Sequence, residues 1–318
     1  MSVDLSVLKS TLRLRYRAAL RPAQGHRFQP TGFPDLGAAV YQHGDQENLL
    51  VESPQSMANR MEMTCWQESC NELIEPLQGI SYIRVEKDGS YLTSSIMESH
   101  RINSPYILES KDRSFFNTLK EEVAVLEDGP IDRRKLAQML FKYDINALIH
   151  GVFLAKKDLA GGRLRVSRAL SSFIEAEGTK LATSGGVKND HVNPQGETKS
   201  GFGNVPFSRQ EFTAKEINAY FSIDLAQLRG YGLDEDATEL LILLSLLKIR
   251  MLLAGDLRLR TACDLELVEQ PACTSSPAFT LPASDDLTKA VKSKISDLTG
   301  RFGGDDSRNG VTIVKYEK

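Results

Sequence analysis

The residues best suited to binding chemistry lie at the start of a predicted helix, where several hydrogen-bond donors carry no negative charge. Ser53 is a good N-cap, and Pro54 suits the first helical position, where a missing N–H costs nothing. A helix N-terminus offers free backbone N–H groups and a partial positive charge. The sequence therefore predicts a surface here that suits an anion such as a phosphate.

Side chains four residues apart extend this donor surface along the same helix. Gln55 and Asn59 form one pair, and Ser56 and Arg60 form another, on stripes away from the core-facing methionines. Their amides, hydroxyl and guanidinium can donate to phosphate or ribose oxygens. None of these groups needs to read a base edge, so they predict nucleic-acid contacts without sequence preference. An ordinary capped helix with a solvated polar face is the alternative.

A second and looser set of cations lies elsewhere in the chain. Residues 156–209 contain nine Lys or Arg and five Asp or Glu, a local balance of +4, whereas the whole chain has a net charge of −3. A surface for RNA must therefore be a local basic groove in an otherwise neutral or acidic protein. The candidate RNA-binding residues outside the helix are Arg27, Arg165, Arg168, Lys180, Lys188, Lys199 and Arg209.

Catalytic motifs are missing from the sequence. The chain has no P-loop, no HExxH, no GxSxG and no Cys/His cluster with zinc spacing. Asp35, in a turn-rich loop at residues 27–37, could organise a metal or a 2′-hydroxyl beside bound RNA, although an aspartate that forms a turn is the more ordinary interpretation. The sequence predicts no catalytic residue, no metal and no cofactor.

The elements that must position these residues are predicted from hydrophobic spacing. Residues 11–18 alternate and predict a half-buried strand with outward arginines. The helix that begins at Ser53 is predicted to run to about Leu77, since Pro76 and Gly79 mark its end. Residues 147–155 predict an apolar strand with His150 as a hydrogen-bonded core residue, and residues 234–253 predict the main core helix.

A long polar stretch, residues 178–206, is the least conventional part of the chain. Structureless segments of this length in a compact domain are usually functional or disordered. A mildly basic projection with aromatics can wrap a nucleic acid or clasp a neighbouring subunit, and a disordered surface insertion is the alternative. We expect residues 1–318 to form a single domain that carries this insertion.

Composition is ordinary for a soluble globular protein, with 41% hydrophobic and 25% charged residues. The longest apolar stretch, residues 240–247, is too short to span a bilayer and predicts a buried helix. The four cysteines form no CxxC pair, which favours free thiols in a reducing compartment. Together with a start that lacks a signal-peptide pattern, these features predict a cytoplasmic protein with no membrane partner.

Three segments, taken as a set, resemble a known family: Arg27–Gly37, Val51–Arg60 and Gly203–Phe207. They resemble the CRISPR backbone subunit of the Csb-one type, the Cas-seven-like protein of the Cascade subtype I-G, formerly called I-U. The resemblance extends from about Arg13 to Glu269. It implies an α+β fold, namely a modified RRM (ferredoxin-like) palm with inserted finger and thumb segments, in which residues 178–206 would be the thumb.

The resemblance also implies a function in antiviral defence. Copies of such a subunit line up along one CRISPR RNA (crRNA) into a helical filament, together with other Cascade subunits, and the guide pairs with a DNA target. No catalysis is expected, because complexes of this type recruit a separate nuclease. Two rival functions stay open: a type III-like endoribonuclease that cuts target RNA through the loop Asp35, and a protein-interaction scaffold without nucleic acid.

Overall fold

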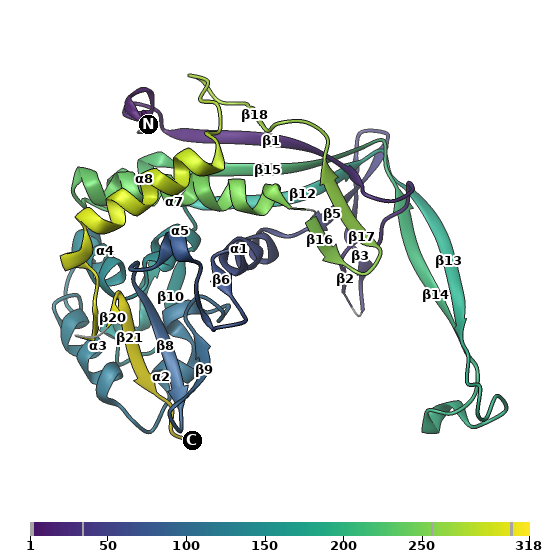
Figure 1. Ribbon diagram of the computed structural model, residues 1–318, viewed down its shortest axis with the longest axis horizontal. Coiled ribbons are helices and arrows are strands. Elements are labelled where there is room, and N and C mark those ends of the chain that lie inside the picture. The colour runs from purple at the N-terminus through teal and green to yellow at the C-terminus, as the bar shows by residue number, and fades with distance from the viewer. Residues whose placement is uncertain (1–2, 34, 256, 306–307) are drawn as a thin grey trace.

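The computed structural model describes residues 3–33, 35–255, 257–305 and 308–318, so Pro34 of the predicted turn-rich loop lies outside the described residues. The fold is α+β, as predicted, with a curled antiparallel sheet at its centre. Figure 1 shows three parts: this sheet with its helices, a lobe below one end, and a long arm at the other. No helix in the described part of the chain has the length and apolar character to cross a membrane.

The main sheet has eight strands in the order β16-β17-β1-β15-β12-β5-β4, and β18 pairs with the edge of β1. Every pairing is antiparallel. The bounds are β1 Arg13–Pro22, β4 Val40–His43, β5 Gln46–Glu52, β12 Leu170–Glu177, β15 Glu216–Asp224, β16 Leu257–Arg260, β17 Cys263–Leu267 and β18 Ala272–Cys273.

The predicted first strand is confirmed, with one correction. Residues of β1 alternate between exposed arginines and buried Leu14, Tyr16 and Ala18, because successive side chains of a strand point to opposite faces. Leu12, which the alternation predicts to be buried, is 66% exposed, since the strand begins only at Arg13. The arginines therefore lie on the open face of the sheet.

Two helices cover the other face: α1 (Pro54–Met63) contacts β12, and α7 (Glu235–Ala254) contacts β15 and α1. The main core helix is thus confirmed. The prediction that the first helix runs to Leu77 is wrong. After Met63 the chain forms a small hairpin, β6 (Trp66–Gln67) with β7 (Glu72–Leu73), in which Trp66 packs on Tyr82 at 5.6 Å between ring centroids. Tertiary packing of that indole overrides the local helical preference.

The lobe is built around a three-stranded sheet, in which β21 is parallel to β8 and β9 is antiparallel to it. Its elements are β8 Tyr82–Lys87, β9 Ser90–Ser94, β10 Val152–Leu154, β11 Leu164–Val166, β21 Val311–Lys315, α2 Pro105–Leu108, α3 Ser114–Ala124, α4 Arg133–Tyr143 and α5 Ile145–His150. The remaining elements are β2 Gly32–Phe33, β3 Gly37–Ala38, β19 Gly304–Asp305, β20 Arg308–Asn309, α6 Leu225–Gly230 and α8 Ser284–Asp297.

The strand predicted over residues 147–155 is wrong. This apolar run is divided between α5 and the short strand β10. Gly151 joins them with φ +83°, and a Cβ there would lie 2.9 Å from the carbonyl oxygen of Val166. A glycine at this junction therefore both turns the chain and allows the close approach.

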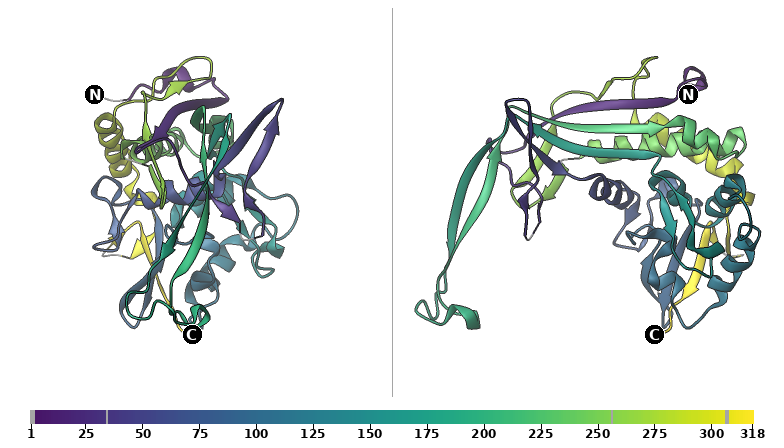
Figure 2. Two further views of the ribbon diagram at one scale, coloured as in Figure 1. Left: turned by 90° about the vertical axis from the view of Figure 1, so that its right-hand side faces the viewer. Right: turned by 180° about the vertical axis from the view of Figure 1, so that it is seen from behind.

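The arm is a two-stranded antiparallel ribbon, β13 (Lys180–Lys188) paired with β14 (Val205–Thr213). It extends away from the sheet, and residues 189–204 form its tip (Figures 1 and 2). A structureless stretch over residues 178–206 is therefore the wrong expectation. The ribbon has almost no buried side chains, so its sequence carries little of the apolar alternation by which strands are predicted.

Candidate nucleic-acid interface

The start of α1 has the capped geometry that the sequence predicts. The hydroxyl of Ser53 accepts a hydrogen bond from the backbone N–H of Ser56 at 3.3 Å, and Pro54 occupies the first turn. Met57 and Met61 are fully buried, which fixes the rotation of the helix. Gln55 is left exposed at the N-terminal end of α1, where unpaired backbone N–H groups attract anions.

Three predicted residues meet at this surface. Gln55 Nε2 donates to Asn59 Oδ1 at 3.1 Å, and Arg168 Nη2 donates to Gln55 Oε1 at 2.8 Å. Arg168 comes from the segment between β11 and β12, more than a hundred residues away in the chain. We call Gln55, Asn59 and Arg168 the α1 rim. Two amides and a guanidinium in contact offer several donors to one anion.

The other two donors of the helix face inward. The hydroxyl of Ser56 donates to Glu52, and Arg60 Nε donates to Glu52 Oε1 at 3.1 Å. Arg60 Nη2 also donates to the carbonyl of Leu259 at 2.5 Å, and its side chain is only 25% exposed. Arg260 forms a further ion pair with the same Glu52 carboxylate.

These hydrogen bonds and ion pairs connect α1 to the strands β5 and β16. Glu52 ends β5, and its side chain is 3% exposed, so its charge requires the two arginines beside it. Arg260 belongs to β16 and also reaches the carbonyl of Gln29, in the loop after β1. Arg60 and Ser56 therefore support the rim, and the contact predicted between them and RNA stays a prediction.

A cluster of buried charges lies behind the rim. Arg101 donates twice to Glu62 of α1, at 2.7 Å each, and both side chains are almost fully buried. Burial and the nearby charge of Arg101 lower the pKa of Arg168. Arg168 Nε is buried without a hydrogen-bond partner among the described residues. An anion at the rim would relieve this unfavourable environment, because it supplies the missing opposite charge.

His150 is a core residue, as predicted, but the predicted hydrogen bond is wrong. Its side chain is 1% exposed, in the core at the end of α5. Neither ring nitrogen has a hydrogen-bond partner in the part of the chain that the structure describes. Burial, with the charges of Lys248, Arg101 and Arg168, holds its pKa well below the usual value. The ring is therefore neutral and does not add to the positive charge.

The register of the arm places its predicted cations on one face. Lys180, Ser184 and Lys188 share a face of β13, and Arg209 lies opposite Ser184. Arg209 also lies over the ring of Phe207, at 5.4 Å from its centroid. The opposite face is uncharged in both strands, with these residues: Leu181, Thr183, Gly185, Val187, Pro206, Ser208, Gln210 and Phe212.

Three predicted cations lie apart from the rim. Arg27 forms an ion pair at 3.2 Å with Glu211, a carboxylate on the same face of the arm as Arg209, at the arm's base. Lys199 is exposed at the arm's tip. Arg165 is exposed on β11, opposite Phe153 of β10. Figure 2 shows α1 below the sheet, with the arm to one side and the lobe to the other.

Asp35 lies exposed in the turn between β2 and β3, as its surroundings of Gly and Pro predict. Among the described residues, no group of three or more His, Cys, Asp and Glu side chains has a geometry that could hold a metal ion. All four cysteines are free.

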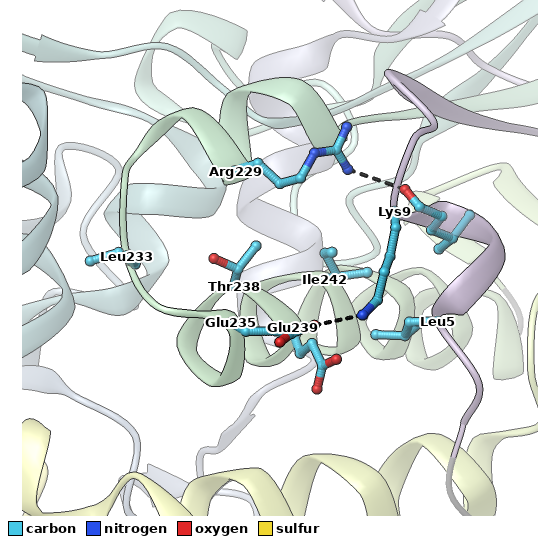
Figure 3. Close-up of a pocket in the computed structure, with 9 residues that line it drawn as sticks. Leu5, Lys9, Arg229, Leu233, Glu235, Thr238, Glu239 and Ile242 are labelled. Atoms are coloured by element: carbon cyan, nitrogen blue, oxygen red, sulfur yellow. Dashed lines mark hydrogen bonds and ion pairs between the residues drawn. The ribbon is translucent and has the colours of Figure 1, made fainter.

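A separate pocket of about 350 Å³ lies between the N-terminal 3-10 turn (Ser6–Leu8) and α7. Beside it, Lys9 donates to Glu235 at 2.8 Å (Figure 3). Arg229 donates to the carbonyl of Leu8 at 3.2 Å. None of the predicted RNA-binding residues lines this pocket, so it belongs to a different surface.

Comparison with known proteins places the chain among CRISPR proteins. The family model described as CRISPR-associated protein GSU0053 matches residues 14–181. No curated protein sequence matches the chain.

Two solved structures illustrate the likeness in three dimensions. A chain of a CRISPR RNA-guided surveillance complex, pre-nicking, is 12% identical, with 91% of this chain and 88% of that chain covered and a TM-score of 0.44. Csc2 from Thermofilum pendens is 9% identical, with 94% and 80% covered and a TM-score of 0.34. Identities and TM-scores this low establish neither the fold nor the function of this chain.

Proposed function

The chain belongs to the family of CRISPR-associated protein GSU0053, whose model matches more than half of it, and from this premise we propose a non-catalytic backbone subunit of a CRISPR surveillance complex. Membership of the family confirms the predicted place in a CRISPR system. The subunit binds the sugar-phosphate backbone of CRISPR RNA and oligomerises along it. The observation that carries this proposal is the α1 rim, where Gln55, Asn59 and Arg168 meet at a helix N-terminus.

The order of elements supports an RRM-like palm. The elements β1, α1, β12, β15, α7 and β17 follow one another in the βαββαβ sequence, and the four strands lie in the order β17-β1-β15-β12. This order of strands supports the proposed ferredoxin-like palm. The part of the lobe that is inserted between α1 and β12 then contains the finger segments, and the arm inserted between β12 and β15 is the thumb.

Contacts at the α1 rim bind RNA without recognising its base sequence. Amide and guanidinium donors recognise phosphate and ribose oxygens that every nucleotide shares. The charged face of the arm supplies Lys180, Lys188 and Arg209 as a second set. Guide bases stay available to pair with a DNA target. Base pairing then recognises the target sequence, while the protein binds the backbone of the duplex, as described for another RNA-guided effector.

The remaining features are proposals that follow from the same premise. The chain works in the cytoplasm, beside further copies of itself and other Cascade subunits, and its subtype is I-G. The arm of one copy reaches over the RNA toward the next copy, which its extension beyond the sheet allows (Figure 1).

Co-purification tests the proposal. The full chain is expressed with a CRISPR transcript and purified, and the bound RNA is sequenced. For the wild type we expect the ratio of absorbance at 260 and 280 nm to indicate bound nucleic acid, and the sequenced RNA to contain guide sequences. The double variant Gln55→Ala with Asn59→Ala should lose both. The matched control is Asn117→Ala with Gln138→Ala, two exposed amides on α3 and α4.

Two outcomes would contradict the proposal. A wild-type chain that purifies without nucleic acid under every buffer would indicate a scaffold. Regular cuts in complementary RNA with Mg²⁺, abolished by Asp35→Ala, would indicate an endoribonuclease.

A further inference from the structure

The ribbon formed by β10 and β11 presents an aromatic ring that the sequence analysis did not assign to any role. Phe153 is 53% exposed, and its direct cross-strand partner is the exposed Arg165. Directly opposite side chains in an antiparallel pair lie on the same face, about 5 Å apart at Cβ. A ring and a guanidinium thus stand side by side in solvent.

The ribbon is rigid because its other face is packed. Leu154 and Leu164 oppose each other and are both fully buried. The chain enters the ribbon through Gly151, where the backbone of Val166 leaves no space for a side chain. An exposed aromatic on such a support is pre-organised, so little conformational entropy is lost when a planar group stacks on it.

One end of the ribbon, where β10 begins and β11 ends, is connected to α1 twice. Just before β10, the carbonyl of Gly151 accepts a hydrogen bond at 3.1 Å from Arg101, which also holds Glu62 of α1. Just after β11, Arg168 donates to Gln55 in the first turn of α1. The position of Phe153 relative to the α1 rim is therefore fixed by two connections at the end of the ribbon nearest α1.

We propose that Phe153 and Arg165 form a stacking subsite for one base of the single-stranded RNA that the α1 rim holds by its backbone. This inference rests on the proposed function and adds to it a contact with a base. Aromatic rings accept any base, because every base has a π-face. Arg165 adds a cation that can stack or bind the adjacent phosphate. The subsite orients a nucleotide without selecting its identity.

Fluorescence anisotropy of the full-length chain with a labelled, unstructured oligoribonucleotide tests the subsite. Phe153→Ala should weaken binding roughly 5- to 150-fold with an unchanged slope of log Kd against log salt. Phe153→Tyr should bind like the wild type, whereas Phe153→Leu, which keeps the apolar bulk without the ring, should resemble the alanine variant. Arg165→Ala should lower the salt slope by about 0.7, as expected for one lost phosphate contact to a single strand.

A second probe reports stacking directly. An oligoribonucleotide with 2-aminopurine at successive positions should lose fluorescence on binding the wild type at one or more of them, and Phe153→Ala should restore it. Tyr106→Ala, at an exposed ring on α2 of the lobe, is the control and should leave the quenching near Phe153 unchanged. Thermal melting of each variant shows whether it is folded.

The outcomes separate this inference from the proposed function. If Arg168→Ala weakens binding while Phe153→Ala and Phe153→Leu bind and quench like the wild type, the stacking subsite is wrong and the RNA-binding role stands. If the wild type binds no RNA, both are wrong.

Discussion

Replacement of Arg168 by alanine should separate RNA binding from stability. The guanidinium loses one charged hydrogen bond to Gln55, worth about 1.5–3 kcal/mol. The same change removes an Nε that is buried without a partner among the described residues, and a charge whose pKa is lowered by burial and by Arg101. An unsatisfied buried donor costs about 1–3 kcal/mol. The two contributions nearly cancel, so the free energy of unfolding should change by less than about 1 kcal/mol.

RNA affinity should respond differently. A charged hydrogen bond to a phosphate contributes about 1.5–3 kcal/mol, so Arg168→Ala should weaken binding about 10- to 150-fold. The slope of log Kd against log salt should fall by about 0.7 for a single strand. Anisotropy titrations at several salt concentrations measure both, and urea unfolding of the same preparation measures stability. The control is Lys289→Ala, an exposed cation on α8.

Two results would refute this reasoning. Unchanged affinity and salt slope in Arg168→Ala would show that the α1 rim does not hold a phosphate. A loss of stability above about 2 kcal/mol would show that Arg168 supports the fold, and that the weakened binding is a consequence of unfolding.

Three further predictions concern the support behind the rim. Arg60→Ala should destabilise the fold by about 2–4 kcal/mol, because it leaves Glu52 with one arginine, and Arg60→Lys should recover only part of this in urea unfolding. Glu62→Gln should cost about 3–5 kcal/mol, because Arg101 is then buried without its carboxylate; an unchanged urea midpoint would contradict that pairing. Burial and Glu62 raise the pKa of Asp144 to about 7. The folded chain therefore keeps a proton that the unfolded chain has already released, and stability should fall as pH rises from about 4 to about 7. Asp144→Asn should flatten this dependence in unfolding curves measured across that range, and an equal slope in both proteins would disprove the assignment.

Much of the fold could be predicted wherever burial imposes a period on the sequence. β1 alternates because only one of its faces is buried, whereas α7 is marked by a nearly continuous apolar run, since residues 240–249 are all buried. The arm could not be predicted in this way, because it buries almost nothing and its pairing depends on backbone hydrogen bonds. The end of α1 was misplaced because Trp66 packs on rings that come later in the chain.

The candidate site shows the same limit. Spacing of four residues placed Gln55 and Asn59 side by side, as the structure has them. It could not show that Arg60 turns toward Glu52, since that depends on Arg260 and the carbonyl of Leu259. Phe153 was missed because it lies in an apolar run, which predicts an inward position. Its outward position follows only once β10 is known to be a strand, because Phe153 must then point away from its buried neighbour Leu154.

Charged and uncharged side chains lie on opposite faces of the arm because they occupy alternate positions along its two strands. Because neighbouring side chains point to opposite faces, one residue inserted between Lys180 and Lys188 would turn these two lysines away from each other. An insertion in the tip would change neither face. The arm can therefore vary in reach by pairs of residues along its strands, or freely at its end, and still present the same charged edge.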